Sequence, residues 1–240
     1  MAGVITALPN ITAALKPGSR LNVLAIGSAT MFGPEASLSP GTITSQALGD
    51  GHLNDVQAQP IPQEASERAF PRQMAKTLQA TVPGSDVHVT VRGGRGLVAA
   101  DMLALIKAEL PLQHPQLVLW QTGTVEAVRN LPPGEFAQTL ADGIEAIHAA
   151  DADLILIDPQ FSRFLQTNSN LDPYVQALQQ AASMPGVLLF RRFDLMRSWV
   201  NDGQIDLERT ARADRQKTVE TLHACLGSHL ARLVLGAARY

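Results

Sequence analysis

The segment Leu21–Gly33, LNVLAIGSATMFG, decides the fold class of this chain. It starts as a continuous apolar run, stops at a glycine, and continues into small and hydroxyl-bearing residues. A first strand that ends in this way places its turn over the carboxyl edge of a parallel sheet, where open α/β sheets bind their ligands. The segment therefore predicts a strand and also the edge of the sheet at which a site lies.

Five apolar runs have the length of strands. Most are continuously apolar rather than alternating, as in parallel strands covered on both faces: Val23–Ile26, Val87–Val91, Leu117–Gln121, Leu154–Ile157 and Val187–Phe190. Helical patterns lie between them at Pro71–Leu78, Leu97–Leu110, Glu135–Ala150 and Pro173–Ala182, and another ends in Leu230–Leu235. This alternation indicates βαβ units. We expect an α/β fold, a three-layer α/β/α sandwich with a five-stranded parallel sheet.

The chain is expected to form one domain over residues 1–240. Its 240 residues suit a single core, and 45% hydrophobic with 17% charged residues is an ordinary globular composition. Residues 1–20 read as an N-terminal extension. Residues 34–69 are rich in proline, glycine and serine, and we expect a long surface loop or lid there, beside the first turn.

Charge and cysteine content narrow the function classes. The net charge of −3 gives no reason to expect nucleic acid as a partner, and the single Cys225 excludes an internal disulfide framework. No apolar run has the length of a membrane span, and Pro9 interrupts the apolar N-terminus, which argues against a signal peptide. A cytoplasmic location is therefore expected. The histidines and the cysteine lack metal-ligand spacing, so we expect no metal site.

Four short blocks follow one another along the chain: a small-residue turn at 27–33, a glycine turn at 93–96, a Gly-Thr turn at 123–124 and a late histidine at 223. In this order they resemble the blocks of the SGNH (GDSL-type) hydrolase family, and the resemblance covers most of the chain. It implies a flavodoxin-like sheet and the hydrolysis or transfer of acyl esters, often acetyl groups on carbohydrates. It also implies no metal or organic cofactor.

The first block departs from the Gly-Asp-Ser pattern of that family. Without a gap, Ala29 takes the place of the nucleophile and Ser28 that of the aspartate. A slip of one residue makes Ser28 the nucleophile instead. The ungapped register is the simpler one, and it excludes covalent catalysis because alanine carries no nucleophilic atom. Ser28 could also be an ordinary turn hydroxyl bonded to nearby backbone.

The second and third blocks correspond to the oxyanion-binding groups of the family. Gly96 stands where a backbone amide would help to hold the oxyanion, although a plain glycine turn would look the same. Gly123 and Thr124 match the third block, but Val125 replaces its asparagine and Glu126 its aspartate. Valine cannot donate to an oxyanion, and loss of one such donor typically lowers the rate by about 10²–10³.

The last block of the family, Asp-x-x-His, corresponds to Glu220 and His223, which would be the orienting acid and the base. Alternatively, residues 218–238 form one amphipathic helix with His223 packed on it. A third register uses residues 206–208 and contains no histidine. Separately, Asp158 ends the fourth predicted strand, so we expect it at the ligand-binding edge.

Two functional hypotheses follow. In the first, favoured slightly, the protein is a divergent family member with lost or strongly reduced esterase activity. It would bind an acyl or carbohydrate ester ligand, or serve as an accessory protein in bacterial polysaccharide modification. In the second it is an active carboxylic-ester hydrolase or O-acyltransferase that uses Ser28, His223, Glu220 and the Gly96 amide.

Overall fold

The computed structural model describes residues 8–38, 59–60 and 64–238. Its centre is a sheet with the order β2-β3-β1-β4-β5-β6. The strands are β1 (Arg20–Gly27), β2 (Gln59–Pro60), β3 (Asp86–Arg95), β4 (Leu117–Gln121), β5 (Asp153–Ile157) and β6 (Val187–Phe190). All five predicted strands are present and pair in parallel. The short β2, which was not predicted, adds an antiparallel edge beside Gly94 and Arg95.

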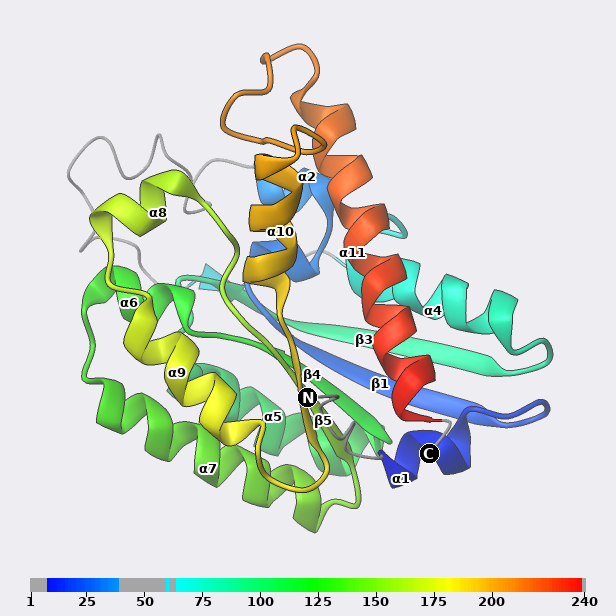
Figure 1. Ribbon diagram of the computed structural model, residues 1–240. Coiled ribbons are helices and arrows are strands. Elements are labelled where there is room, and N and C mark those ends of the chain that lie inside the picture. The colour runs from blue at the N-terminus through cyan, green and yellow to red at the C-terminus, as the bar shows by residue number, and fades with distance from the viewer. Residues whose placement is uncertain (1–7, 39–58, 61–63, 239–240) are drawn as a thin grey trace, which may run out of the picture.

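Helices cover both faces of the sheet, as Figure 1 shows. One layer contains α1 (Pro9–Ala14), α4 (Phe70–Thr81) and α11 (Arg215–Ala237), and the other contains α5 (Ala99–Gln113), α7 (Pro133–Ala149) and α9 (Asp172–Ala181). Shorter elements sit at the carboxyl edge of the sheet: the 3₁₀ turn η1 (Ala29–Met31), α2 (Pro34–Leu38), α6 (Thr124–Arg129), α8 (Arg163–Asn168) and α10 (Arg192–Asn201). The three-layer prediction is confirmed.

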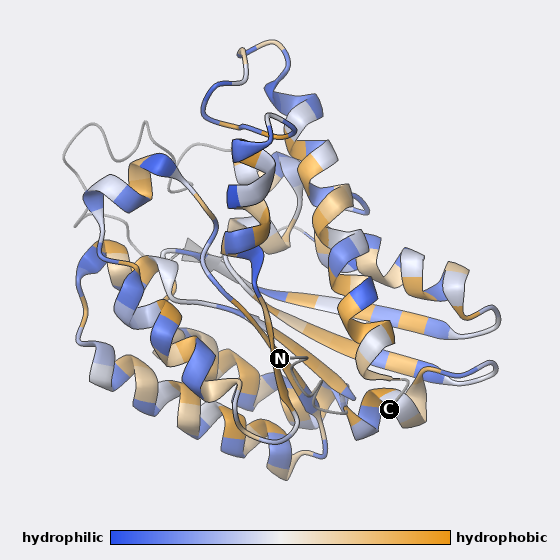
Figure 2. Ribbon diagram, viewed as in Figure 1, coloured by the Kyte–Doolittle hydropathy of each residue, from blue (hydrophilic) through white to orange (hydrophobic). Residues whose placement is uncertain are grey.

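The strands are held by two apolar cores, one on each face. β4 and β5 are buried along their whole length, which explains why their sequences are continuously apolar rather than alternating. Figure 2 shows the apolar colour concentrated in the strands and on the inward sides of the helices. The hydrophobic effect thus fixes the sheet, and the polar residues at its carboxyl edge are left to form a site.

The segment predicted as a loop, residues 34–69, contains α2 and β2, and its end leads into α4. Residues 39–58 and 61–63 lie outside the described residues, so the lid expectation concerns a part of the chain that the structure does not describe. In the N-terminal extension, α1 is fastened to the sheet by the buried Asp153. Its carboxylate accepts from the Ile11 amide (2.8 Å) and from Asn10 Nδ2 (3.1 Å).

Candidate functional site

The carboxyl end of β1 passes very close to its neighbours. Strand β1 ends at Gly27, where a Cβ atom would lie 2.6 Å from Met31 Cγ and 2.9 Å from Gln121 Cβ. Glycine is therefore required if Gln121 is to lie against this turn. The next residue, Ser28, is partly exposed, whereas Ala29 is buried.

Three hydrogen bonds connect four side chains at this turn in series, and each side chain donates to the next. Gln121 Nε2 donates to Ser28 Oγ (2.9 Å), and Thr30 Oγ1 donates to Gln121 Oε1 (2.8 Å). Arg192 Nη1 in turn donates to Thr30 Oγ1 (3.3 Å). We call Arg192, Thr30, Gln121 and Ser28 the arginine relay. Ser28 Oγ is thus bound to a side chain 93 residues away, and within the described part of the chain it has no hydrogen bond to nearby backbone, unlike an ordinary turn hydroxyl.

The relay starts at a fully buried cation. Arg192 is 1% exposed, and its Nε and Nη2 atoms have no hydrogen-bond partner among the described residues. Burial lowers the pKa of Arg192 to about 10, which leaves the guanidinium charged at neutral pH. Arg192 is the first residue of α10 and lies two residues after the end of β6, so its charge lies at the carboxyl edge of the sheet.

Asp158, expected at the ligand-binding edge, is buried there. Its Oδ1 accepts from the Phe193 amide (2.9 Å) and so caps the first turn of α10. Burial raises the pKa of Asp158 to about 6, and the nearby Arg192 charge offsets only part of this. Asp158 therefore positions α10, and it lies within electrostatic reach of the relay.

His223 is enclosed between three helices. It is 1% exposed in α11; its Nδ1 bonds the amide nitrogen of Phe70 (3.2 Å), and its Nε2 bonds Ser37 Oγ (3.2 Å). Burial, with a smaller effect of the Arg192 charge, lowers the pKa of His223 to about 3, so the ring is neutral near pH 7. The expected alternative of one helix with His223 packed on it is the arrangement found: α11 runs from Arg215 to Ala237.

The two bonds fix the tautomer of this ring. A backbone amide can only donate, so Nδ1 of His223 is the acceptor and carries no proton. The single proton of the neutral ring is then on Nε2 and is donated to Ser37 Oγ. The Ser37 hydroxyl donates its own proton to the Gly33 carbonyl (2.8 Å), which completes a consistent chain. Neither ring nitrogen of His223 has a lone pair left for another group.

Glu220 does not orient His223, contrary to the expectation for an acid–base pair. Its carboxylate pairs with Arg68 and accepts from Gln216 Nε2 (2.7 Å). The Nδ1 atom that an orienting carboxylate would contact is taken by the Phe70 amide. Glu220 is partly exposed on α11, whereas His223, less than one turn further along the same helix, is buried. No hydrogen bond among the described residues joins Ser28, His223 and Glu220.

The third block is occupied by an internal clamp. The carboxylate of the buried Glu126 accepts from the amides of Gly123 (3.0 Å) and Ala99, and so joins the first turns of α6 and α5. Burial raises the pKa of Glu126. The Gly123 amide therefore donates its hydrogen bond to Glu126. Thr124 is the first residue of α6, and Val125 is buried. Gly96, at φ +68°, lies in the turn between β3 and α5, and α5 itself starts at Ala99.

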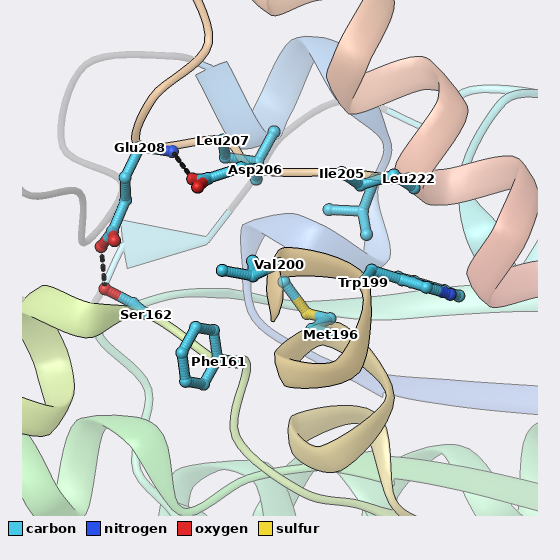
Figure 3. Close-up of a pocket in the computed structure, with 10 residues that line it drawn as sticks. All are labelled: Phe161, Ser162, Met196, Trp199, Val200, Ile205, Asp206, Leu207, Glu208 and Leu222. Atoms are coloured by element: carbon cyan, nitrogen blue, oxygen red, sulfur yellow. Dashed lines mark hydrogen bonds between the residues drawn. The ribbon is translucent and has the colours of Figure 1, made fainter. Parts of the chain in front are cut away.

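A small, mostly apolar pocket lies beside α10 and α11 (Figure 3). It is lined by Phe161, Ser162, Met196, Trp199, Val200, Ile205, Asp206, Leu207, Glu208 and Leu222. Figure 3 shows Ser162 and Glu208 joined at one side, with a bond of 2.7 Å from Ser162 Oγ. Asp206 binds Arg163 through both carboxylate oxygens (3.1 and 2.9 Å). Asp206 and Glu208, the carboxylates of the alternative register that contains no histidine, therefore join residues 206–208 to the start of α8.

Sequence reasoning missed Gln121, Thr30, Arg192 and Ser37. Two of them carried a recognisable signal, because Gln121 is the single polar residue of β4 and Arg192 lies two residues after the apolar β6 ends. Among the residues that the structure describes, no group of three histidine, cysteine, aspartate or glutamate side chains is placed to hold a metal ion. None of the described helices is long and apolar enough to span a membrane.

Solved structures share this architecture. A lipase/acylhydrolase from Enterococcus faecalis superposes with a TM-score of 0.62 at 17% identity, covering 90% of this chain and 96% of that one. A variant of Axe2, an acetyl-xylooligosaccharide esterase from Geobacillus Stearmophilus, gives 0.61 at 14% identity, covering 94% and 96%. A two-domain esterase active on acetylated mannans gives 0.60 at 13% identity, covering 97% of this chain and 52% of that one. At these identities the likeness establishes the fold.

The family is identified by comparison of the sequence with protein-family models. A comparison with curated protein sequences finds no significant match. Residues 52–240 match the profile of the family described as Non-GDSL lipase-like, a span of most of the chain that includes α4, α10 and α11. The chain belongs to this Non-GDSL lipase-like family.

Proposed function

We propose that this chain is a non-hydrolytic member of its family, which binds an acyl or carbohydrate ligand at the carboxyl edge of the sheet without cleaving it. The observation that carries the proposal is the tautomer of His223. Its Nδ1 accepts from the Phe70 amide and its Nε2 donates to Ser37 Oγ. A general base needs a free lone pair within reach of the nucleophile, and this ring offers none.

Two further features support the loss of hydrolysis. Val125 stands in place of the asparagine that would donate to an oxyanion, and the Gly123 amide is bound to Glu126. Ser28 Oγ is held by Gln121, an amide that cannot act as a base at neutral pH. The machinery for activating a serine is therefore replaced by contacts that join helices.

The ligand class rests on the family and on its structural neighbours. One neighbour is described as an acetyl-xylooligosaccharide esterase and another as active on acetylated mannans. We extend their substrate class to this chain as a bound ligand, and with it the role of an accessory protein in polysaccharide modification. Ser28 and Thr30 are both partly exposed, so the end of the relay is open to such a ligand.

Labelling with a fluorophosphonate serine probe, mapped by peptide mass spectrometry, tests the proposal. We expect no adduct on Ser28 in protein whose folding is verified by circular dichroism, with an active esterase of the same fold labelled in parallel. Hydrolysis of p-nitrophenyl acetate should likewise not exceed that of the Ser28→Ala variant. A Ser28 adduct that disappears in His223→Ala would overturn the proposal and establish the ester hydrolase.

A further inference from the structure

We propose that the ligand carries a carboxylate group, and that this group binds at Ser28, close to the buried charge of Arg192. This inference rests on the proposed function, because it takes the carboxyl edge of the sheet as a binding site. It goes further by naming the chemical group that is recognised.

The hydrogen bonds of the arginine relay all run in one direction. Each member donates to the next, from Arg192 through Thr30 and Gln121 to Ser28 Oγ. Because Ser28 is the final acceptor, its own proton points away from the relay, and no acceptor for it is found among the described residues. Chains of hydrogen bonds polarise one another, so a relay that starts at a cation makes its terminal hydroxyl a stronger donor. Such a hydroxyl favours a charged acceptor.

The buried charge of Arg192 is only partly compensated by the nearby Asp158. Among the described residues no carboxylate lies within ion-pairing distance of this guanidinium. Asp158 is the nearby acid, and its Oδ1 accepts a hydrogen bond from the Phe193 amide. Nε and Nη2 are also without partners within this part of the chain. Burial of this cation is only partly offset by Asp158 and by the bond to Thr30, and an anion bound nearby relieves more of the cost.

The relay lies at the carboxyl edge of the sheet. Arg192 follows β6, Ser28 and Thr30 follow β1, and Gln121 ends β4, so the relay gathers the carboxyl ends of three strands. Open α/β sheets bind their ligands at this edge. Arg192 itself is fully buried while Ser28 is partly exposed, so the anion accepts from the Ser28 hydroxyl and is attracted by the buried charge of Arg192.

Two classes of carboxylate ligand can be distinguished by a binding experiment. A uronic acid fits the carbohydrate class, whereas a fatty acid fits the acyl class. We would titrate the full chain at pH 7 with glucuronate and with hexanoate by isothermal titration calorimetry. Glucose and hexanamide serve as the matched neutral probes. We expect at least one carboxylate to bind ten times more tightly than its neutral counterpart, and the arm that binds identifies the source.

Substitutions in the arginine relay test whether it causes the preference for carboxylate over neutral probes. Arg192→Met should abolish the preference for the carboxylate, and Thr30→Val, which breaks the relay without removing the charge, should weaken binding several-fold. Arg197→Met is the control, because Arg197 lies on the same helix but pairs at the surface with Asp194 and should leave binding unchanged. If Arg192→Met does not fold, the Thr30→Val variant carries the comparison.

Equal affinity for charged and neutral probes, or a carboxylate preference that survives Arg192→Met and Thr30→Val in folded protein, would overturn the inference. Its failure is distinguishable from that of the proposed function. Carboxylate binding together with a fluorophosphonate adduct on Ser28 would reject the non-hydrolytic role and keep the anion site. No adduct and no carboxylate preference would reject the anion site alone.

Discussion

The Phe70 amide donates to Nδ1 of His223 over 3.2 Å, so a histidine expected to be a catalytic base instead caps the first turn of a neighbouring helix. The residue before Phe70 is alanine, which offers no side-chain acceptor to the free amides at the start of α4. The imidazole of α11 fills that role, and through Ser37 it also holds α2.

The first prediction concerns the stability that this contact provides. His223→Ala removes two hydrogen bonds and leaves a cavity beside Phe70, so we expect the free energy of unfolding to fall by about 2–4 kcal/mol. His223→Gln should recover part of the loss, since an amide can accept from Phe70 and donate to Ser37. Urea denaturation followed by circular dichroism measures both. Glu220→Gln is the matched control on the same helix and should cost less than about 1 kcal/mol, because its pair with Arg68 is partly exposed.

A loss as small in His223→Ala as in Glu220→Gln would contradict a structural role for the imidazole.

The second prediction concerns pH. The pKa of His223 is lowered from 6.5 to about 3, so below pH 6.5 the unfolded chain binds a proton here that the folded chain does not. Stability from this group therefore falls as pH falls from about 6.5 towards 3. The pKa of Asp158 is raised from 3.8 to about 6, so between those values the folded chain holds the extra proton. Its contribution therefore rises as pH falls from about 6 to 3.8, in the opposite direction.

These two effects should largely cancel between about pH 4 and pH 6. Asp158→Asn removes one of them, so the variant should lose stability on acidification by roughly 1 kcal/mol per pH unit more than the parent. Urea titrations at several pH values provide the measurement, with the exposed Asp142→Asn as control. Parallel pH profiles for Asp158→Asn and the parent would contradict the assigned shifts.

The third prediction concerns the close approach at the end of β1. A Cβ atom on Gly93, at φ +137°, would lie 1.9 Å from the Gly27 carbonyl oxygen, and this is backbone that cannot yield easily. Gly93→Ala should therefore destabilise the fold by more than about 2 kcal/mol. Gly27→Ala should cost about 1–3 kcal/mol and should also push Gln121 away from Ser28. Gly134→Ala, with nothing within 4 Å of the added methyl group, should change stability by less than about 1 kcal/mol.

Thermal and urea denaturation rank these three variants, and the side-chain amide resonances of Gln121 report its displacement. Equal stability of Gly93→Ala and Gly134→Ala would be incompatible with the strand spacing described above.

The fourth prediction concerns the clamp between α5 and α6. Both carboxylate oxygens of Glu126 accept from backbone amides, those of Gly123 and Ala99. In Glu126→Gln one oxygen becomes an NH₂ group that faces a donor, so we expect a loss of about 1–3 kcal/mol. Glu135→Gln is the control, since Glu135 is exposed in the first turn of α7. A clamp variant as stable as this control would show that Glu126 does not join the two helices.

Much of the fold could be predicted from the sequence because burial dictates it. The runs 117–121 and 187–190 coincide with β4 and β6, since a strand covered on both faces must be apolar throughout. The short β2 carries no such signal, because two residues at a sheet edge need no apolar pattern. The C-terminal helix was among the alternatives, and the burial of His223 within it follows from its apolar face.

The candidate site was less predictable, because its contacts join residues far apart in the chain. The hydrogen bond from Gln121 to Ser28 spans 93 positions, and that between His223 and Phe70 spans 153. Sequence spacing suggested Glu220 as the partner of His223, but the direction of each side chain on α11 decides its contacts. The prediction that Val125 replaces an oxyanion-binding asparagine, by contrast, rests on residue type alone.

The protonation state of His223 tests the central claim most directly. Long-range ¹H–¹⁵N correlation spectra of the labelled protein distinguish a protonated from an unprotonated ring nitrogen, and the His223→Gln variant assigns the signals. We predict a neutral ring with its proton on Nε2, unprotonated at Nδ1, and no titration between pH 5 and pH 8. A proton on Nδ1, or a titration near pH 7, would contradict the account and return His223 to the role of a catalytic base.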